Sequence, residues 1–306
     1  MANDRLEEAL TDSRRAVALK PDLISGHANL GTCLDHLLRP DEALKSYQAV
    51  LALDPNSGDA IQFCRYVPLL AERGAILEID RPLKELMTGV KGVAQCVDRT
   101  GTLPDHDFHC PLASLPLAFD TRLETIPPVP QFSVHAPIGG WDALLGPHDR
   151  PRVGIVWSGN PTHANDHRRS VPFESLTPLF GVDATFVSLQ KNAREADLAL
   201  LRERSDVLDA ASRLENFADT VSLIQHLDLV ISVATSVAHL AGAIGASVWI
   251  LLPYLPDYRW LPDRDDSPWY PTARLYRQTA TRDYADVLGR VCADLSERIS
   301  TWHRSK

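Results

Sequence analysis

Polar side chains suited to holding a phosphate follow two apolar, β-branched stretches of the chain. The stretch RVGIV leads to Ser158, Gly159 and Asn160, which offer a hydroxyl, a backbone open to close approach and an amide. The stretch TFVS leads to Gln190 and Lys191. A diphosphate needs backbone donors and one or two cations. These two loops therefore suit a diphosphate, provided that they lie at the same edge of a sheet.

A third apolar stretch, LVISV, passes through a short polar turn into VAHLAGAIG, whose small residues suit a helix packed close to a sheet. Such a turn leaves backbone N–H groups unpaired at the helix start, and these attract phosphate. Thr235 and Ser236 lie in the turn, and His239 lies one helical turn further on. Arg168 and Arg169 add positive charge from the loop after RVGIV. Because parallel strands end at a common edge, the three loops are predicted to form one phosphate-binding edge.

The elements that must position these loops alternate between strands and helices. A predicted helix over 59–74 is followed by strands at AILEID, VAQCV and FHC, with a helix at RPLKELMTG between the first two. The stretch 111–150 is rich in proline, and regular alternation resumes at RVGIV and ends with a helix over 284–299. This pattern predicts two Rossmann-like units that face a cleft and bind ligand beyond the carboxyl ends of their strands.

A repeat precedes these units. The segment DEALKSYQAVLALDPN matches EEAL and AVALKPD further upstream, and Pro21 and Pro55 are 34 positions apart. A fixed period of this size indicates paired helices and resembles the tetratricopeptide repeat. About one and a half repeats are present, so a peptide-binding groove and a plain helical cap both stay open. The predicted division is a helical segment at 1–57, a partial Rossmann-like domain at 58–148 and a second Rossmann-like domain at 149–306.

Composition excludes several classes of protein. The formal charge of −9 disfavours a dedicated nucleic-acid binder, which needs clustered Lys and Arg. No apolar run approaches the roughly 20 residues of a membrane span, and the start lacks a signal-like pattern, so a cytoplasmic location is expected. Five cysteines without a CxxC pair indicate neither a zinc ribbon nor a disulfide framework. His106, His109 and Cys110 fit a strand end better than a metal site, and no metal is expected.

The segments RVGIVWSGNPTHANDHRRSVPFESL, FVSLQK, NFADTVSLIQHLDLVISVATSVAHLAGAIG and VWILLPYLPDYRW resemble the carboxyl half of bacterial tetratricopeptide-repeat glycosyltransferases. These are heptosyltransferase-like family 9 enzymes, distantly similar to O-GlcNAc transferases. The resemblance covers about residues 152–290, and the preceding part is similar to the same proteins' first domain. It implies an α/β fold, a GT-B-like pair of Rossmann-like domains with a short N-terminal all-α tetratricopeptide segment.

The resemblance also implies an activity. It is metal-independent transfer of a sugar from a nucleotide-sugar to a protein or glycan acceptor, with the protein acceptor presented by the tetratricopeptide segment. The nucleotide-sugar is a substrate, and no cofactor is implied. By resemblance, Asp59 in the Gly-Asp pair is the general base. The implied donor and phosphate contacts are Ser158, Gly159, Asn160, Arg168, Gln190, Lys191, Asp219, Thr220, Thr235, Ser236 and His239.

Two departures from the family pattern favour an alternative. Ala234 stands where the family commonly has Asp, and LALDPN runs directly into SGD, so the first strand of the first sheet is expected to be missing. The alternative is a degenerate, non-catalytic member that acts as a nucleotide-binding or protein-interaction module. An aromatic group stacks a base or sugar, or seals the domain edge; it comprises Tyr254, Tyr258, Trp260, Trp269 and Tyr270.

Overall fold

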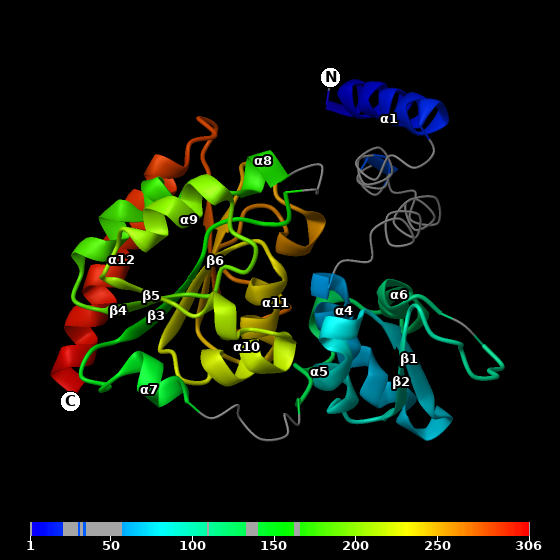
Figure 1. The fold of residues 1–306 in the computed structure, drawn as a ribbon. Coiled ribbons are helices and arrows are strands. Elements are labelled where there is room, and N and C mark those ends of the chain that lie inside the picture. Colours follow the sequence, from blue (N-terminus) through cyan, green and yellow to red (C-terminus); the bar gives the residue numbers. More distant parts are fainter. Residues whose placement is uncertain are drawn as a thin grey trace.

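A computed structural model describes residues 2–20, 30, 33–34, 57–108, 110–132, 140–161 and 166–305, which form two α/β parts and an N-terminal helix (Figure 1). Helix α1 (Ala2–Leu19) covers the predicted helix of the partial repeat. Most of the complete repeat lies outside the described residues, as do His109 and His163. No helix within the described ranges combines the length and the apolar character that crossing a bilayer requires.

The carboxyl part is built on a six-stranded parallel sheet with the order β5-β4-β3-β6-β7-β8. The strands are β3 (Arg152–Val156), β4 (Thr185–Ser188), β5 (Val207–Asp209), β6 (Leu229–Val233), β7 (Val248–Leu252) and β8 (Ala273–Arg277). The chain starts in the middle at β3, moves outward to β5 and returns beside β3 as β6. The direction of winding therefore reverses between β3 and β6, which is where open α/β sheets bind their ligands.

Helices cover both faces of this sheet (Figure 1). Helices α10 (Phe217–Ile224) and α11 (Ser236–Ala243) pack on one face. Helices α9 (Glu195–Arg202) and α12 (Tyr284–Ser305) and the 3₁₀ helix η5 (Phe173–Gly181) pack on the other. In β7, Val248 and Ile250 point to the first face, whereas Trp249 and Leu251 point to the second. Burial on both faces explains why these strands are continuous apolar runs in the sequence.

The smaller part carries a two-stranded parallel sheet of β1 (Ala75–Ile79) and β2 (Val93–Asp98). Its remaining elements are short: α4 (Ser57–Phe63), η1 (Cys64–Arg73), η2 (Arg81–Leu83), α5 (Lys84–Thr88), η3 (Leu112–Ser114), α6 (Leu115–Ala118) and η4 (Leu123–Thr125). Helices α7 (Trp141–Leu145) and α8 (Asp166–Arg169) belong to the carboxyl part, and the predicted boundary at 148 and 149 falls just before β3.

Two predicted elements of the smaller part were wrong. The helix predicted over 59–74 is α-helical only in α4 and continues as the 3₁₀ helix η1, which contains Pro68. Proline lacks an N–H and disrupts α-helical hydrogen bonding. Of the strand predicted at FHC, the described residues Phe108 and Cys110 have no regular secondary structure, and His109 lies outside the described residues. The residues directly before Ser57, where the first strand of the first sheet was expected to be missing, lie outside the described residues.

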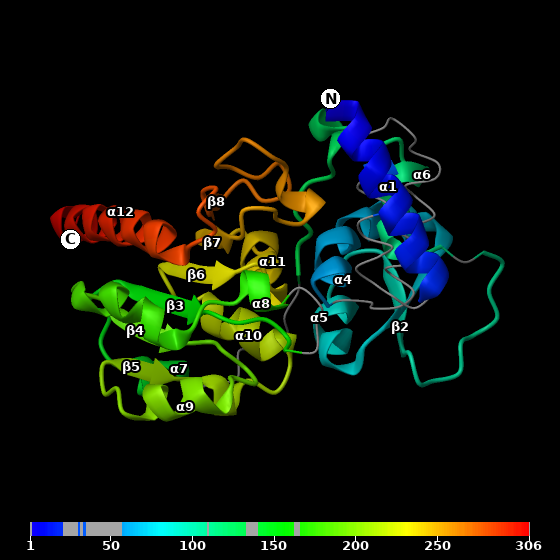
Figure 2. The same cartoon turned by 90° about the horizontal axis from the view of Figure 1, so that it is seen from above.

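One hydrophobic core joins the two parts. It contains Ile61 and Val67 from the smaller part together with Val221 and Leu240 from α10 and α11. Helix α4 packs directly on α11, and the views in Figures 1 and 2 both place it there. A Cβ added at Gly58 would lie 2.8 Å from Cδ2 of His239. The contact between α4 and α11 therefore requires glycine at this position.

Gly242→Ala is expected to destabilise the fold. A Cβ at Gly242 would lie 2.4 Å from Cγ of Tyr270, whose fully buried ring has no room to move. We expect the free energy of unfolding to fall by about 1–3 kcal/mol in urea denaturation. Gly289→Ala in α12 is the matched control, since nothing lies within 4 Å of the added carbon. It should raise stability by about 0.5–1 kcal/mol. Equal effects of the two substitutions would contradict this packing.

Candidate functional site

The loop after β3 is tied to the end of β4 by one side chain. The backbone N–H groups of Trp157 and Ser158 donate to Oε1 of Gln190 at 3.0 and 2.9 Å. The indole of Trp157 is buried and donates to Asp197 at 3.0 Å. Gln190, predicted as a donor contact, thus uses its amide oxygen to shape the loop that leads to the ligand edge.

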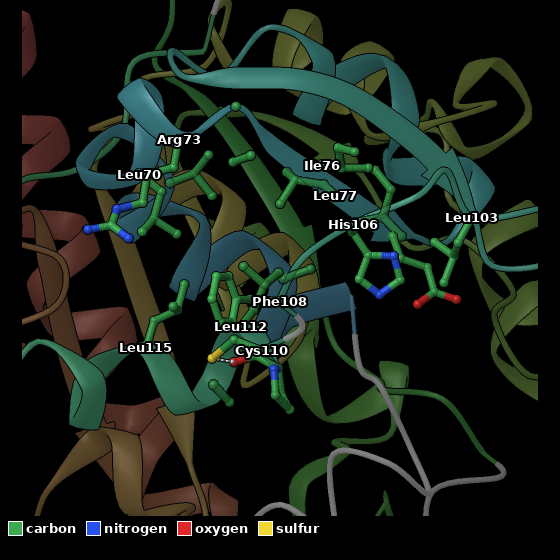
Figure 3. A pocket seen from close by; sticks show the side chains of 18 of the residues that line it. Leu70, Arg73, Ile76, Leu77, Leu103, His106, Phe108, Cys110, Leu112 and Leu115 are labelled. Carbon is green, nitrogen blue, oxygen red and sulfur yellow. Dashed lines mark hydrogen bonds between the residues drawn. The ribbon is translucent and has the colours of Figure 1, made fainter.

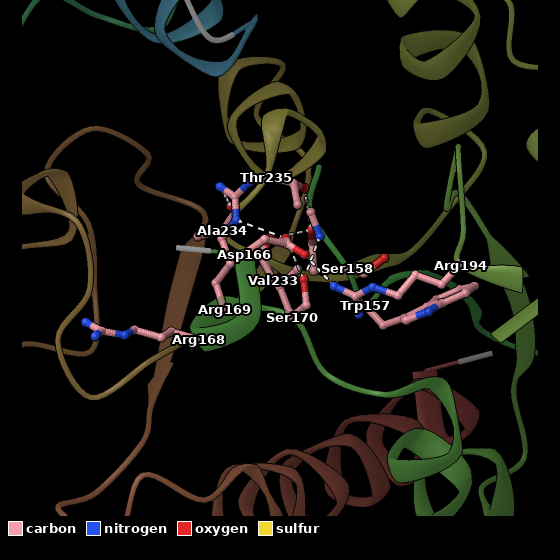
Figure 4. A network of polar contacts seen from close by, with 12 residues as sticks. Trp157, Ser158, Asp166, Arg168, Arg169, Ser170, Arg194, Val233, Ala234 and Thr235 are labelled. Carbon is pink, nitrogen blue, oxygen red and sulfur yellow. Dashed lines mark hydrogen bonds and ion pairs between the residues drawn. The ribbon is translucent and has the colours of Figure 1, made fainter. Parts of the chain in front are cut away.

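A buried carboxylate organises the next part of the loop (Figure 4). Asp166 accepts a hydrogen bond from the hydroxyl of Ser170 at 2.7 Å, and Ser170 accepts one from the N–H of Gly159 at 3.0 Å. Arg194 forms an ion pair with the same carboxylate, and Nε of Arg169 lies 3.5 Å from it. A Cβ at Gly159 would lie 2.6 Å from the guanidinium of Arg169, so a larger residue here would displace this side chain.

Arg169 spans the point where the winding of the sheet reverses. Its Nη1 donates to the carbonyl of Ala234, directly after β6, at 3.3 Å (Figure 4). The hydroxyl of Thr235 lies 3.1 Å from that of Ser232 and makes no cap bond to α11. The first-turn N–H groups of a helix have no partners within the helix and favour an anion. The β3 and β6 loops thus bring a guanidinium to an uncapped helix start.

Ser158 adds a further donor to this edge. Its hydroxyl is buried and makes no hydrogen bond within the described part of the chain. A buried hydroxyl without a partner is costly, and a bound oxygen atom would satisfy it. The arrangement of Ser158, Arg169 and the start of α11 can hold a phosphate or another small oxyanion.

Lys191 and Asp219, both predicted to contact the donor, hold a neighbouring loop. Nζ of Lys191 donates to two backbone carbonyls, one of them that of Glu215 at 3.0 Å. The carboxylate of Asp219 accepts from the N–H groups of Glu215 and Asn216 at 2.7 and 3.0 Å. The Asn216 amide then donates to Glu85 of the smaller part at 3.0 Å. Lys191 and Asp219 thus hold the loop at residues 214–216, which contacts the smaller part through Glu85.

The other predicted residues are distributed as follows. Thr220 is buried and donates to the carbonyl of Asn216 at 3.2 Å, inside the start of α10. Ser236 is the first residue of α11, and Asn160 is exposed at the end of the β3 loop. Arg168 is exposed and points away from the network, whereas its neighbour Arg169 points into it (Figure 4). Successive helical residues differ by about 100° in direction, so only one of the two can face the site.

His239 lies where the smaller part packs on the carboxyl part through α4 and α11, a contact called the seam below. Its Nδ1 shares a hydrogen bond of 2.9 Å with the hydroxyl of Tyr270, and its ring stacks on Trp260 at 5.1 Å. Burial, followed by the positive charges of Arg259 and two further arginines, holds the pKa of His239 well below its ordinary value of 6.5. A neutral imidazole therefore lies against Gly58, one turn into the helix whose start faces Arg169.

Asp59, the candidate base, is engaged across the same seam. It is buried and forms an ion pair with Arg259, which also pairs with Asp257 at 2.8 Å. Sequence reasoning did not single out Arg259, and it named Arg169 only together with Arg168 as a source of positive charge. Arg259 is 200 positions from Asp59, and no short motif links two residues so far apart.

Of the five aromatic side chains between Tyr254 and Tyr270 named above, three are packed between the two parts and two are exposed. Trp260 and Tyr270 are buried in the seam, and Trp269 packs edge-on against Phe63 at 5.9 Å, so these rings seal the junction. Tyr254 and Tyr258 are exposed, and their predicted alternative of stacking a base or sugar stays a prediction. Within the described ranges, no three His, Cys, Asp or Glu side chains are arranged to hold a metal ion.

The doubly wound sheet, the smaller α/β part packed on its α10–α11 face and the ligand edge between β3 and β6 define a GT-B-like α/β fold. The tetratricopeptide repeat family matches residues 24–57. The structure of E. coli ADP-heptose lps heptosyltransferase II shares the fold, with a TM-score of 0.53 and 14% sequence identity over 81% of this chain and 97% of that one. The predicted GT-B-like fold and N-terminal tetratricopeptide segment are confirmed.

Two curated proteins are similar in sequence. Protein FlbA of Caulobacter vibrioides is 27% identical over 202 residues, which are 62% of this chain and 32% of FlbA. The Protein STIP1 homolog of Dictyostelium discoideum is 39% identical over 69 residues, which are 22% of this chain and 12% of that protein. The chain thus spans about a third or less of the length of either relative.

The neutral state of His239 predicts a pH dependence of stability. The unfolded chain takes up a proton at this residue below pH 6.5, whereas the folded chain does not, because its pKa is lowered. This contribution is present above pH 6.5 and is lost as the pH falls, at up to about 1.4 kcal/mol per pH unit. His239→Gln should remove that part of the slope in urea denaturation between pH 7.5 and 5.5. His106→Gln, at an exposed position, should keep it. An unchanged slope in His239→Gln would refute the assignment.

Proposed function

We propose that the chain binds a nucleoside-diphosphate sugar between β3 and β6 and transfers the sugar to a protein or glycan acceptor. The observation that carries this proposal is the meeting of the Arg169 guanidinium, the uncapped start of α11 and the unpartnered Ser158 hydroxyl at the reversal point of the sheet. The fold shared with a solved structure named as an ADP-heptose lps heptosyltransferase supports it.

In this proposal the diphosphate lies at the first turn of α11. The N–H groups of Ser236 and the next residues donate to its oxygens, and the hydroxyl of Ser158 adds another donor. As the bond to the sugar breaks, negative charge develops on the leaving diphosphate. Arg169 and the positive end of the helix dipole stabilise that charge, so that no metal ion is required.

The proton of the acceptor hydroxyl is taken by Asp59, which acts as general base. In the described state Asp59 is paired with Arg259, so the acceptor must displace or share this ion pair before proton transfer. Because Arg259 belongs to the carboxyl part and Asp59 to the smaller part, a change in their contact would accompany opening of the seam. The tetratricopeptide segment, in this proposal, presents the acceptor protein.

Two observations favour the alternative of a non-catalytic nucleotide-binding or protein-interaction module. The candidate base is buried and already satisfied by a cation, and Ala234 offers no carboxylate at the turn where the resembling family commonly has one. Such a chain would bind a nucleoside diphosphate without turning over its sugar conjugate. Binding and turnover therefore have to be measured separately.

Binding is tested with a panel of UDP, GDP, ADP, dTDP and CMP and their sugar conjugates in a thermal-shift assay. At least one nucleotide should raise the melting temperature, and titration calorimetry then gives its dissociation constant. Arg169→Ala should weaken binding by about tenfold or more, because a charge-assisted bond contributes about 1.5–3 kcal/mol. Ser158→Ala should weaken binding without lowering stability, since its hydroxyl has no partner among the described residues.

The matched control for binding is Arg168→Ala. It removes the same charge one residue away, but the side chain points outward, so the dissociation constant should stay within about twofold of the original at 0.15 M salt. Equal losses in the two arginine variants would indicate only a general electrostatic effect. If no member of the panel binds, the proposed donor site is wrong.

Turnover is tested with the conjugate of whichever nucleotide binds, by measuring release of the nucleoside diphosphate. Asp59→Asn should lower the rate by about 10²–10⁴-fold while leaving nucleotide affinity unchanged, because Asp59 does not contact the proposed diphosphate position. The substitution also weakens the ion pair with Arg259, so the melting temperature of the variant is measured as well. Asp107→Asn, at an exposed position, is the control and should be fully active. Tight nucleotide binding with no release in the unsubstituted protein would instead establish the non-catalytic alternative.

A further inference from the structure

The smaller sheet has an edge that no described strand occupies. Strand β1 pairs only with β2 among the described strands, and the N–H of Arg99 donates to the carbonyl of Ile79 at 3.2 Å. The N–H and C=O of one strand residue point to the same side, and this side alternates along the strand. Leu77 and Ile79 therefore face β2, whereas Ile76 and Glu78 direct their backbone groups to the opposite, open edge.

A cavity of about 790 Å³ runs along β1 (Figure 3). Much of its wall is apolar and comes from η1 and from the chain between β2 and α6, with Leu70, Leu103, Phe108 and Leu112 lining it. Phe108 is 90% exposed and Leu103 is 41% exposed. Exposed apolar side chains beside an open strand edge are typical of a binding surface, because isolated domains usually protect such edges.

More acidic than basic side chains line the cavity. Five carboxylates and the guanidinium groups of Arg73 and Arg99 line it. Asp59 is paired with Arg259 and Asp80 with Arg99, at 3.2 Å for the latter pair. The other three carboxylates have no described ion pair: Glu78, Asp105 and Asp107. Figure 3 places Leu103 and His106, which adjoins two of these carboxylates in sequence, across the cavity from Arg73 and Leu70. A ligand that runs along β1 therefore meets negative charge near one end.

We propose that this edge binds an extended peptide of a partner protein, which adds to the sheet as a third strand. Its backbone bonds to Ile76 and Glu78, alternate apolar side chains enter the cavity, and a basic residue lies at the acidic end. β1 has five residues, so a segment of about six residues covers it at roughly 3.3 Å per residue. This surface is separate from the proposed nucleotide position at the start of α11, although Asp59, the proposed base, also lines the cavity.

The chemistry of the edge favours this occupant over two others. An acyl chain would fill the cavity but would leave the open backbone groups without hydrogen bonds. The β1 of a second copy could supply those bonds. However, its Leu77 and Ile79 are buried in their own core, so they could not enter the cavity. A free peptide strand supplies both backbone bonds and side chains.

The probe is a fluorescein-labelled peptide of alternating threonine and valine that ends in two lysines, titrated with the full chain by fluorescence anisotropy. We expect saturable binding. Glu78→Pro should weaken it about tenfold or more, through loss of an edge N–H and crowding by the ring. The β1–β2 ladder does not use this N–H, and proline is tolerated on an open edge. The control Ala94→Pro, on the outer edge of β2, should bind like the unsubstituted protein.

Two N-methylated peptides keep the test decisive even if Glu78→Pro is unstable. One is methylated at every threonine and the other at every valine, so each blocks one edge of the peptide strand. Only the peptide blocked on the edge that faces β1 should lose binding. Equal binding of both, or unchanged binding by a folded Glu78→Pro variant, would overturn the proposal. Dimerisation in sedimentation experiments that Glu78→Pro abolishes would assign the edge to a second copy and would also overturn it.

Discussion

The close approach of α4 to α11 is the contact on which the arrangement of this molecule depends. At Gly58 the chain passes the His239 ring so closely that no side chain fits, and the ring is held by Trp260 and Tyr270. Burial among arginines keeps the imidazole neutral, so the seam needs no compensating carboxylate at that point. Because α11 is fixed through this ring, the direction of its first turn is fixed as well.

That direction matters because the start of α11 lies where the sheet reverses its winding. A buried carboxylate would be costly alone, but Asp166 is satisfied by Ser170 and by two arginines. The same contacts hold Arg169 so that it reaches the carbonyl of Ala234. Packing of the seam and pairing of one buried acid thus place the Arg169 guanidinium beside the uncapped start of α11, the arrangement that we propose holds an oxyanion.

The strands of the larger sheet could be predicted because they are buried on both faces. Side chains on both faces of such a strand are mostly apolar, so nearly continuous apolar runs such as LVISV and VWILL indicate it in the sequence. The smaller part was harder. Its helix over 59–74 changes to a 3₁₀ helix, and Phe108 and Cys110 of the predicted FHC strand are irregular. The loops of the site were predicted from strand ends, but the partners of Gln190, Lys191 and Asp219 depend on packing that local patterns do not encode.

The sequence by itself determined the α/β alternation, the tetratricopeptide segment and the loops that gather at the carboxyl edge, because these follow from periodicity and composition over short windows. Only the tertiary structure decided that Arg169 rather than Arg168 faces the site and that Asp59 is held by Arg259. The reason is physical: a side chain's direction and its distant partner are set by three-dimensional packing, and residues 200 positions apart leave no local trace of their contact.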